Sequence, residues 1–266
     1  MDLQGKTILL SGACGGIGSE LAHQLAKLDT KLILLGRSES KLNALKAELA
    51  NSEEHHTLAI DLTAHSDFET LDLLCDSLAR KGKAIDVLIN NAGSNTFSFL
   101  SQRSESSIVD EINVNITAPI LLTKSAINWL NSPGLVVNIG SAFAAIGYPG
   151  YSTYCAGKSA LMRFSEAMNR ELNGTGIKVL FIAPRATDTK INDGAASDLN
   201  AALGNKVDSP EWVAQQIVRH IERESLSAFL GWREKIFATI NALLPAIVSN
   251  NIAKQHATIM QFAGKK

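Results

Sequence analysis

Short apolar runs alternate with longer amphipathic stretches along the chain, and this alternation constrains its fold more than any other feature. Runs rich in Leu, Ile and Val are typical of parallel strands that are buried on both faces. Between two such runs, Leu42, Leu45 and Leu49 share one face of a predicted helix that can cover the sheet. The pattern predicts an α/β protein with a doubly wound, parallel, seven-stranded sheet, whose strands are Thr7 to Leu10, Lys31 to Leu35, Thr57 to Ile60, Val87 to Asn90, Leu135 to Ile139, Lys178 to Ile182 and Ala228 to Leu230.

The composition is that of an ordinary globular protein. The 266 residues are 45% hydrophobic and contain no repeat or Pro-rich linker, so a single domain is expected. A net charge of -1 without a basic run argues against a nucleic-acid partner. The three cysteines include no C-x-x-C pair, which predicts neither a disulfide framework nor a metal site. The N-terminus lacks the sections of a signal peptide, and we expect a cytoplasmic location.

A glycine-rich loop follows the first predicted strand and precedes a helical pattern. It reads Ser11-Gly12-Ala13-Cys14-Gly15-Gly16-Ile17-Gly18. Glycines at such a turn permit positive φ, let the backbone approach a pyrophosphate, and aim the amides of the helix N-terminus at its charge. A tight turn alone would also need glycine, but the order strand, turn, helix favours a dinucleotide cofactor.

Three polar residues form a candidate catalytic centre. Ser141 ends the fifth predicted strand, at the carboxyl edge where open α/β sheets bind their ligands, and Tyr154 and Lys158 share one face of the next helix. An adjacent cation favours a phenolate, so we expect Lys158 to lower the pKa of Tyr154. Tyr154 could then exchange a proton with a carbonyl oxygen whose carbon receives a hydride, while Ser141 hydrogen-bonds that oxygen. Tyr151 has only Cys155 four residues later, so it is not the expected acid.

Together these motifs resemble those of the classical short-chain dehydrogenase/reductase family. The resemblance covers Lys6 to about Leu230 and includes the three-residue spacing between Gly12 and Gly16. It implies a Rossmann fold and hydride transfer between a nicotinamide cofactor and a carbonyl or alcohol. It also implies that the catalytic residues are Asn115, Ser141, Tyr154 and Lys158, with Asn115 helping to hold a water through which Tyr154 and Lys158 exchange protons with solvent.

The resemblance further implies where a cofactor would bind. Residues 1–232 are expected to form the NADP-binding and catalytic domain, and residues 233–266 a helical extension of the same domain. Lys158 would also hold the nicotinamide ribose. The expected cofactor-binding residues are Gly12, Cys14, Gly15, Gly16, Ile17, Gly18, Arg37, Asp61, Leu62, Asn91, Ala92, Gly93, Tyr154, Lys158, Pro184, Thr187 and Thr189.

The end of the second strand predicts which nicotinamide cofactor is used. A carboxylate at this place would accept hydrogen bonds from an adenosine ribose, whereas a cation would pair with a 2′-phosphate. The chain has Gly36-Arg37 there, and the planar guanidinium of Arg37 suits a phosphate. A solvated surface arginine is the alternative. The sequence therefore favours NADP(H) over NAD(H).

The chain departs from the family pattern after the sixth strand, where Arg185 replaces the usual glycine of a Pro-Gly pair. Arg185 either binds an acidic group of the substrate, or points to solvent or pairs with a lid carboxylate such as Asp188. The segment Asn192 to Asn205 is rich in Ala, Asn, Asp and Gly, and predicts either a lid over the ligand, as a mobile loop or short helix, or a solvated surface loop.

The C-terminal tail carries an apolar helical stripe that is interrupted by Pro245. Such a stripe needs a partner, and a pocket cover or a subunit interface is favoured, the latter within a homodimer or homotetramer. A membrane surface is less favoured because the flanking cations, Lys235, Lys254, Lys265 and Lys266, are few. The stripe consists of Ile236, Phe237, Ile240, Leu243, Leu244, Ile247 and Val248.

The predicted function is NADPH-dependent reduction of a ketone or aldehyde, with a hydrophobic or acyl-chain carbonyl compound as the small-molecule substrate. Two alternatives keep the fold: an epimerase or dehydratase that returns its cofactor unchanged, and a non-catalytic NADP-binding regulatory protein. The presence of Ser141, Tyr154 and Lys158 together favours catalysis.

Overall fold

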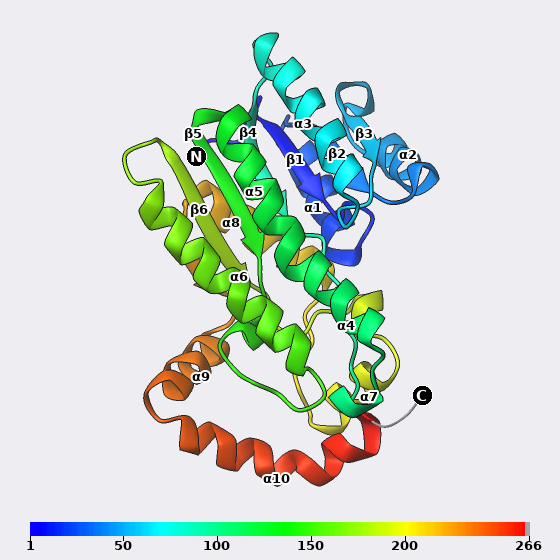
Figure 1. The fold of residues 1–266 in the computed structure, drawn as a ribbon, viewed down its shortest axis with the longest axis vertical. Coiled ribbons are helices and arrows are strands. Elements are labelled where there is room, and N and C mark those ends of the chain that lie inside the picture. Colours follow the sequence, from blue (N-terminus) through cyan, green and yellow to red (C-terminus); the bar gives the residue numbers. More distant parts are fainter. Residues whose placement is uncertain (264–266) are drawn as a thin grey trace.

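Seven parallel strands form one sheet in the order β3-β2-β1-β4-β5-β6-β7 in the computed structural model, which describes residues 1–263 (Figure 1). The order reverses between β1 and β4, which opens a crevice at the carboxyl ends of these strands. The doubly wound seven-stranded fold predicted from the sequence is confirmed. The strands are β1 Thr7–Ser11, β2 Lys31–Gly36, β3 His56–Ala59, β4 Ile85–Asn90, β5 Leu130–Ile139, β6 Ile177–Ala183 and β7 Ser227–Phe229.

Alternate residues of each central strand enter two separate cores. Ile8 and Leu10 belong to one core, whereas Leu9 between them belongs to the other. The first core is covered by α1 (Gly16–Ala26), α2 (Glu39–Glu48) and α8 (Pro210–Glu222). The second is covered by α3 (His65–Arg80), α5 (Ala118–Trp129) and α6 (Ser152–Glu171), of which α5 and α6 cross the front of the sheet in Figure 1.

Strand boundaries differ from the prediction mainly at β5. It begins at Leu130 rather than Leu135, because Leu130 pairs with Ile85 of β4 across a register shift. This early part contains Asn131 to Pro133 and lacks the apolar run on which the prediction depended. β4 begins two residues earlier than predicted, and β3, β6 and β7 each begin one residue earlier.

The helix between β4 and β5 is interrupted by a π turn. It consists of α4 (Glu105–Ile112), the π turn Asn113–Thr117 and α5, and the residues at both junctions keep right-handed helical dihedrals. Such turns insert an extra residue and are frequent at functional sites. Here the turn carries Asn115, which is 1% exposed.

The tail forms two helices that wrap around the end of the molecule beyond the sheet (Figure 1). They are α9 (Trp232–Leu243) and α10 (Pro245–Ala263), and they meet at 116° where Pro245 breaks the stripe. On its inner side α10 packs Ile259 and Ala263 against Leu199 of α7 (Ala195–Ala202). The predicted segment Asn192 to Asn205 thus contains a short helix, and the tail covers it.

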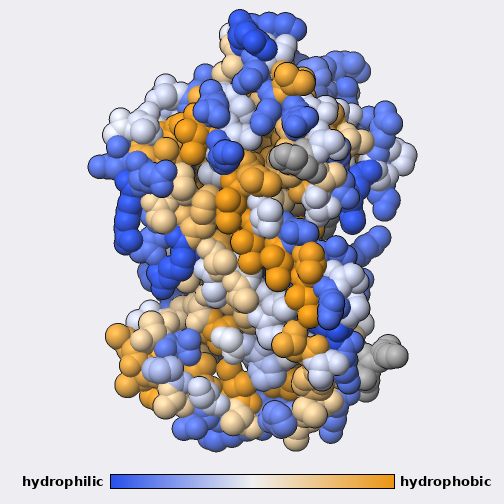
Figure 2. Space-filling model, in the orientation of Figure 1, coloured by the Kyte–Doolittle hydropathy of each residue, from blue (hydrophilic) through white to orange (hydrophobic). Residues whose placement is uncertain are grey.

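The outer side of the tail is apolar and exposed, and Figure 2 shows hydrophobic atoms over α9 at the lower left. Part of the predicted stripe therefore packs inward, as Val248 does, and part faces outward. No helix within residues 1–263 is long and apolar enough to cross a membrane alone, although α9 and α10 together pass that test as a bent pair. Lys265 and Lys266 lie outside the described residues. The exposed apolar residues are Trp232, Ile236, Phe237, Leu243, Leu244 and Ile247.

Candidate active site

Ser141, Tyr154 and Lys158 meet at the carboxyl edge of the sheet, as predicted. Ser141 follows β5, and its hydroxyl is hydrogen-bonded to Tyr154 in the first turn of α6. One turn further on, Lys158 Nζ donates to the Ile139 carbonyl at 3.0 Å and lies 5.7 Å from the centre of the Tyr154 ring. The three side chains are thus fixed by β5 and α6, two regular elements that border the crevice.

Burial is the largest cause of the pKa shifts of Tyr154 and Lys158. It raises the pKa of Tyr154 to about 12, although the hydrogen bond from Ser141 opposes the rise. It also lowers the pKa of Lys158 to about 8, because a buried ammonium loses its hydration. The prediction that Lys158 lowers the pKa of Tyr154 is therefore wrong. Desolvation of the phenolate is the largest cause of the shift, and the charge of Lys158 is not among its causes.

Asn115 lies beside Lys158 but uses its side chain for structure. Its Nδ2 donates to the Ser94 carbonyl at 2.7 Å, and its Oδ1 accepts from the Ser94 amide at 3.3 Å. A Cβ added to Gly93 would lie 3.1 Å from Asn115 Oδ1 and 3.5 Å from Lys158 Nζ. Asn115, Lys158 and the loop after β4 therefore converge on one point.

The glycine loop is shaped for close approach of an anion. Gly12 has φ of +63°, and a Cβ there would lie 2.7 Å from Ala92 Cα. Within residues 1–263 no side chain caps the first amides of α1, whose N-cap residue is Gly15. These amides are available to a pyrophosphate, so the loop fits a dinucleotide cofactor. Ile17 packs on the core below, and a side chain at Gly18 would meet the Gly12 carbonyl.

Asparagines after β4 hold the glycine loop in place. Asn91 Nδ2 donates to the carbonyls of Ser11 and Gly12, both at 3.1 Å. The amides of Asn91 and Ala92 donate to Ser11 Oγ at 3.0 and 3.1 Å. Asn90 instead bonds Asn138 Oδ1 at 2.8 Å inside the sheet. The predicted motif therefore joins the end of β4 to the glycine loop after β1.

Two cations flank the place expected for the adenosine end of a cofactor. Hydrogen bonds from Thr63 lower the pKa of Asp61, and the charge of the exposed Arg37 adds to this effect, so Arg37 lies near Asp61. Partial burial raises the pKa of Cys14, and the charge of Lys41 opposes the rise, so Lys41 lies near the glycine loop. Lys41 was missed by the sequence analysis, although it follows Arg37 closely at the start of α2.

The segment after β6 closes the other side of the crevice. The Pro184 carbonyl accepts from the Ala142 amide at 2.8 Å, next to Ser141. Thr187 is buried, and a Cβ on Gly16 would lie 2.5 Å from Thr189 Cγ2. Leu62, which follows β3, is partly buried against the second core. Thr189 thus lies against the glycine loop, which brings expected cofactor residues from both halves of the chain together.

Arg185 is occupied by carboxylates rather than free for a substrate. Its Nε and Nη2 donate to Asp208 at 2.6 and 2.7 Å, and its Nη1 lies 3.6 Å from Glu234 of α9. The structure therefore agrees with the alternative in which Arg185 pairs with a carboxylate, but that carboxylate is Asp208 rather than Asp188. Because Glu234 belongs to α9, this cluster also ties the tail to the wall of the crevice.

A pocket opens in front of Ser141 and Tyr154, and its wall is largely aromatic. Phe143 and Tyr148 stack with ring centroids 5.3 Å apart, and Tyr151 is 5.0 Å from Phe143. Asn95, which the sequence analysis missed, reaches this pocket from the loop after β4 and hydrogen-bonds Tyr151. The opposite wall consists of Arg185, Ala186, Asn192, Leu199, Asn200 and Asn205.

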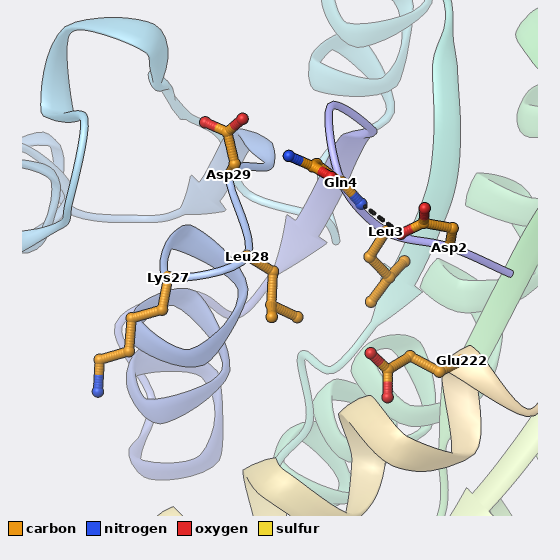
Figure 3. A pocket seen from close by; sticks show the side chains of 7 residues that line it. All are labelled: Asp2, Leu3, Gln4, Lys27, Leu28, Asp29 and Glu222. Atoms are coloured by element: carbon orange, nitrogen blue, oxygen red, sulfur yellow. Dashed lines mark hydrogen bonds between the residues drawn. The ribbon is translucent and has the colours of Figure 1, made fainter.

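Another depression lies at the amino ends of the strands, on the far side of the sheet from this site (Figure 3). Its walls come from the segment before β1, the turn after α1, and Glu222 at the end of α8. Asp29 and Lys27 point away from each other there, and no cluster of facing polar groups forms among the side chains drawn. This depression therefore has no evident catalytic chemistry.

Comparison with known proteins matches the chain to one family. The sequence profile of the family described as short chain dehydrogenase matches residues 6–200. A 3-oxoacyl-(acyl-carrier-protein) reductase of Rickettsia bellii is 31% identical over 78% of this chain and 83% of its own. An NADP-dependent 3-hydroxy acid dehydrogenase of Schizosaccharomyces pombe is 32% identical over 71% of this chain and 74% of its own.

Solved structures give the same picture. A short chain dehydrogenase from Burkholderia cenocepacia, in complex with NADP, superimposes with a TM-score of 0.74 at 27% identity, over 86% of this chain and 97% of its own. A short-chain dehydrogenase from Sphingobium yanoikuyae, in complex with NADPH, gives the same score and identity over 91% of this chain and 95% of its own.

Proposed function

Because this chain belongs to the short-chain dehydrogenase family, we propose that it is an NADPH-dependent oxidoreductase that reduces a ketone or aldehyde to an alcohol. The observation that carries the proposal is the hydrogen bond between Ser141 and Tyr154 at the mouth of an aromatic pocket, with Lys158 beside them. The glycine loop lies on the other side of the same crevice. A carbonyl between them would face both a cofactor and a proton donor.

The side chains divide the reaction between them. The cofactor, when bound, supplies a hydride to the carbonyl carbon. Tyr154 donates its proton to the carbonyl oxygen, and Ser141 stabilises the charge that develops there. A pKa of about 12 keeps Tyr154 protonated at neutral pH, as a proton donor must be. The ammonium of Lys158 then stabilises the resulting phenolate. The phenolate then takes up a proton from solvent through a water held by the backbone carbonyl of Asn115, whose side-chain amide is bonded to Ser94.

The choice of NADPH over NADH rests on the cations at the adenosine end. Arg37 provides a planar fork and Lys41 a point charge, both suited to a 2′-phosphate. Two structural relatives are described as complexes with NADP and NADPH, which supports the same choice. Within the crevice, Asp61 is held by Thr63 and does not stand at the end of β2, where it would repel a phosphate.

Replacing Arg37 by Ala is expected to raise the KM for NADPH by roughly 10- to 100-fold, because a charge-assisted pair with the phosphate is lost. The KM for NADH should change little, since NADH has no 2′-phosphate. Lys46→Ala, on α2, which begins just after Arg37, but near His55, is the matched control and should leave both constants unchanged. Equal losses with both cofactors would contradict the role of Arg37. Steady-state kinetics with each cofactor measures the difference.

The pocket supports a hydrophobic carbonyl as the substrate. Phe143, Tyr148 and Tyr151 offer apolar faces next to the proton donor, and Leu199 of α7 adds to them. An acyl chain would fit such a wall, in keeping with the relatives described as 3-oxoacyl reductases. With both of its sides engaged by Asp208 and Glu234, Arg185 offers no free fork to an acidic substrate.

A panel of carbonyl compounds tests the proposal directly. Aromatic ketones, medium-chain 3-oxoacyl thioesters and small charged ketones would each be incubated with NADPH and with NADH. Loss of NADPH absorbance with the hydrophobic members is expected. A substrate that is consumed while NADPH is returned would indicate an epimerase or dehydratase instead, and binding of NADPH without turnover of any member would favour a regulatory protein.

A further inference from the structure

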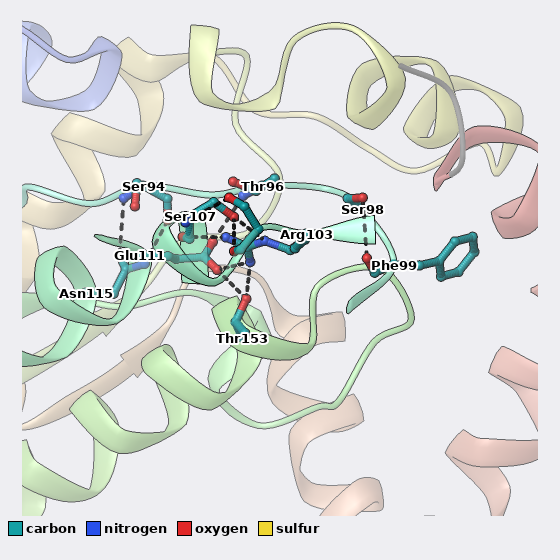
Figure 4. Close-up of polar contacts among 10 residues, drawn as sticks. Ser94, Thr96, Ser98, Phe99, Arg103, Ser107, Glu111, Asn115 and Thr153 are labelled. Carbon is teal, nitrogen blue, oxygen red and sulfur yellow. Dashed lines mark hydrogen bonds and ion pairs between the residues drawn. The ribbon is translucent and has the colours of Figure 1, made fainter. Parts of the chain in front are cut away.

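A buried ion pair lies next to the catalytic helix and takes no part in the reaction described above. Arg103, just before α4, and Glu111, in the last turn of α4, pair at 2.5 Å with side chains that are each 2% exposed. The hydroxyl of Thr153 completes the cluster by donating to Glu111 Oε2 and accepting from Arg103 Nη1. Figure 4 shows the three side chains converging from α4, the segment before it and α6.

Glu111 also hydrogen-bonds the loop after β4, which forms one wall of the substrate pocket. Its Oε1 accepts from the Thr96 amide at 3.1 Å. One turn along the same helix, Asn115 holds both backbone groups of Ser94. The residue between these two anchors is Asn95, which lines the pocket and bonds Tyr151. The conformation of Asn95 is therefore fixed from both sides by the helix that carries Asn115.

The same cluster reaches the proton donor through the backbone. Thr153 directly precedes Tyr154 in the first turn of α6, so anchoring Thr153 fixes the start of the catalytic helix against α4. The carboxylate also acts through space, since its charge raises the pKa of both Tyr154 and Lys158. The other groups facing this point are Cys155 of α6 and the guanidinium of Arg103.

Stability alone is a poor explanation for such a pair. Removing two charges from water costs as much as their attraction returns, and apolar side chains of similar size often serve a fold equally well. Here all three guanidinium nitrogens of Arg103 have a hydrogen-bond partner. Nη1 bonds Glu111 and Thr153, and Nε and Nη2 donate to the side-chain hydroxyl and the carbonyl of Ser107 at 3.1 and 2.7 Å. A fully satisfied buried network specifies one arrangement of the elements that it joins.

We propose that Glu111, held by Arg103, is a positioning residue of the active site. It locks the pocket loop and the first turn of α6 onto one helix, and so sets the distance between the substrate wall at Asn95 and the proton donor at Tyr154. This inference rests on the proposed carbonyl reduction for its kinetic consequences. Its structural part, the anchoring of the loop, can be measured without any substrate.

The first test is Glu111→Gln, which keeps the size of the side chain and removes its charge. Lacking that charge, Tyr154 and Lys158 should each lose a proton at lower pH, while Arg103 stays buried without its partner. We expect kcat at neutral pH to fall by about tenfold or more and KM for the carbonyl to rise. The alkaline limb of the kcat profile should move to lower pH. The measurement is steady-state kinetics of the full-length protein, with saturating NADPH, across the pH range.

The second test replaces the whole pair with apolar side chains, as Arg103→Met with Glu111→Met. No buried charge remains, so this variant should fold even where the single variant is unstable. The Thr96 amide loses its acceptor, and hydrogen exchange in the peptide covering Ser94 to Ser98 should become at least about tenfold faster. The KM should rise as in the single variant, and the alkaline limb of the pH profile of kcat should again move to lower pH, because the charge of Glu111 is absent from both variants.

Asp86→Asn is the matched control. Asp86 is also a mostly buried carboxylate with several partners, Lys6, the Thr7 amide and Asn131, but it lies at the amino end of β4. It should lower Tm without moving KM, the pH profile or exchange of the pocket loop. The inference would be overturned if Glu111→Gln behaved like this control, or if the double variant left loop exchange unchanged. A wild type that reduces no carbonyl would defeat the proposed function, and the exchange measurement would still decide this inference.

Discussion

Replacing Tyr154 by Phe is expected to lower kcat for carbonyl reduction by about 10² to 10⁴-fold, the usual contribution of a general acid. The ring stays, so the aromatic pocket and the contact with Lys158 persist, and only the hydroxyl is removed. The KM for the carbonyl should change little by comparison. Steady-state rates with NADPH and the best member of the carbonyl panel measure the loss.

The neighbouring tyrosine provides the comparison. Tyr151→Phe removes a hydroxyl from the same pocket, but that hydroxyl bonds Asn95 rather than Ser141. We expect less than about a tenfold loss in kcat/KM, as for a single neutral hydrogen bond in the pocket wall. Equal losses in the two variants would contradict the assignment of Tyr154 as the proton donor.

Replacing Lys158 by Met is expected to abolish most activity and yet stabilise the fold. Burial lowers the pKa of Lys158 from 10.5 to about 8, which corresponds to about 3 kcal/mol by which folding disfavours the ammonium at neutral pH. The substitution also removes the donor to the Ile139 carbonyl, which reduces this gain in the free energy of unfolding by about 1 kcal/mol. The free energy of unfolding at pH 7 should therefore rise by about 2 kcal/mol, while kcat falls by about 100-fold or more because the phenolate of Tyr154 loses its cation.

The pH dependence of this gain has a definite sign. Between pH 8 and 10.5 the unfolded chain carries a proton on Lys158 that the folded chain has released, so the wild type gains stability as pH rises through this window. The advantage of Lys158→Met should be largest below pH 8 and absent above pH 10.5. Urea unfolding at pH 7 and at pH 10.5 checks this. A variant that is less stable than the wild type at pH 7 would contradict the account.

The sequence predicts the sheet well because the strands between the helices are buried on both faces. Strands of this kind need no alternation of polar and apolar residues, and runs such as Leu32 to Leu35 stand out against their amphipathic neighbours. Where that contrast is missing, at Leu130 to Gly134, the strand was not predicted. The bend of the tail follows from Pro245, but which face of α10 packs inward depends on α7, far away in the sequence.

The candidate catalytic residues can also be found in the sequence, since each lies at a strand end or at helical spacing from another. The pKa shifts of these residues cannot be predicted from the sequence. Whether Lys158 lowers the pKa of Tyr154 depends on burial, which only the folded chain shows. Arg103 and Glu111 likewise look like ordinary helix-surface charges, because nothing in their spacing indicates that Thr153 will be packed between them. Positioning groups of this kind depend on tertiary packing rather than on motif.

Transfer of deuterium from NADPH labelled at C4 of the nicotinamide tests the central claim most directly. With a hydrophobic ketone as substrate, we expect one deuterium on the carbinol carbon of the alcohol, in a stoichiometric ratio to the NADPH oxidised, and no such product with Tyr154→Phe on the same time scale. Mass spectrometry of the product, together with the loss of NADPH absorbance, measures both. Turnover that leaves NADPH unoxidised and the product unlabelled would contradict the proposal that this chain is a carbonyl reductase.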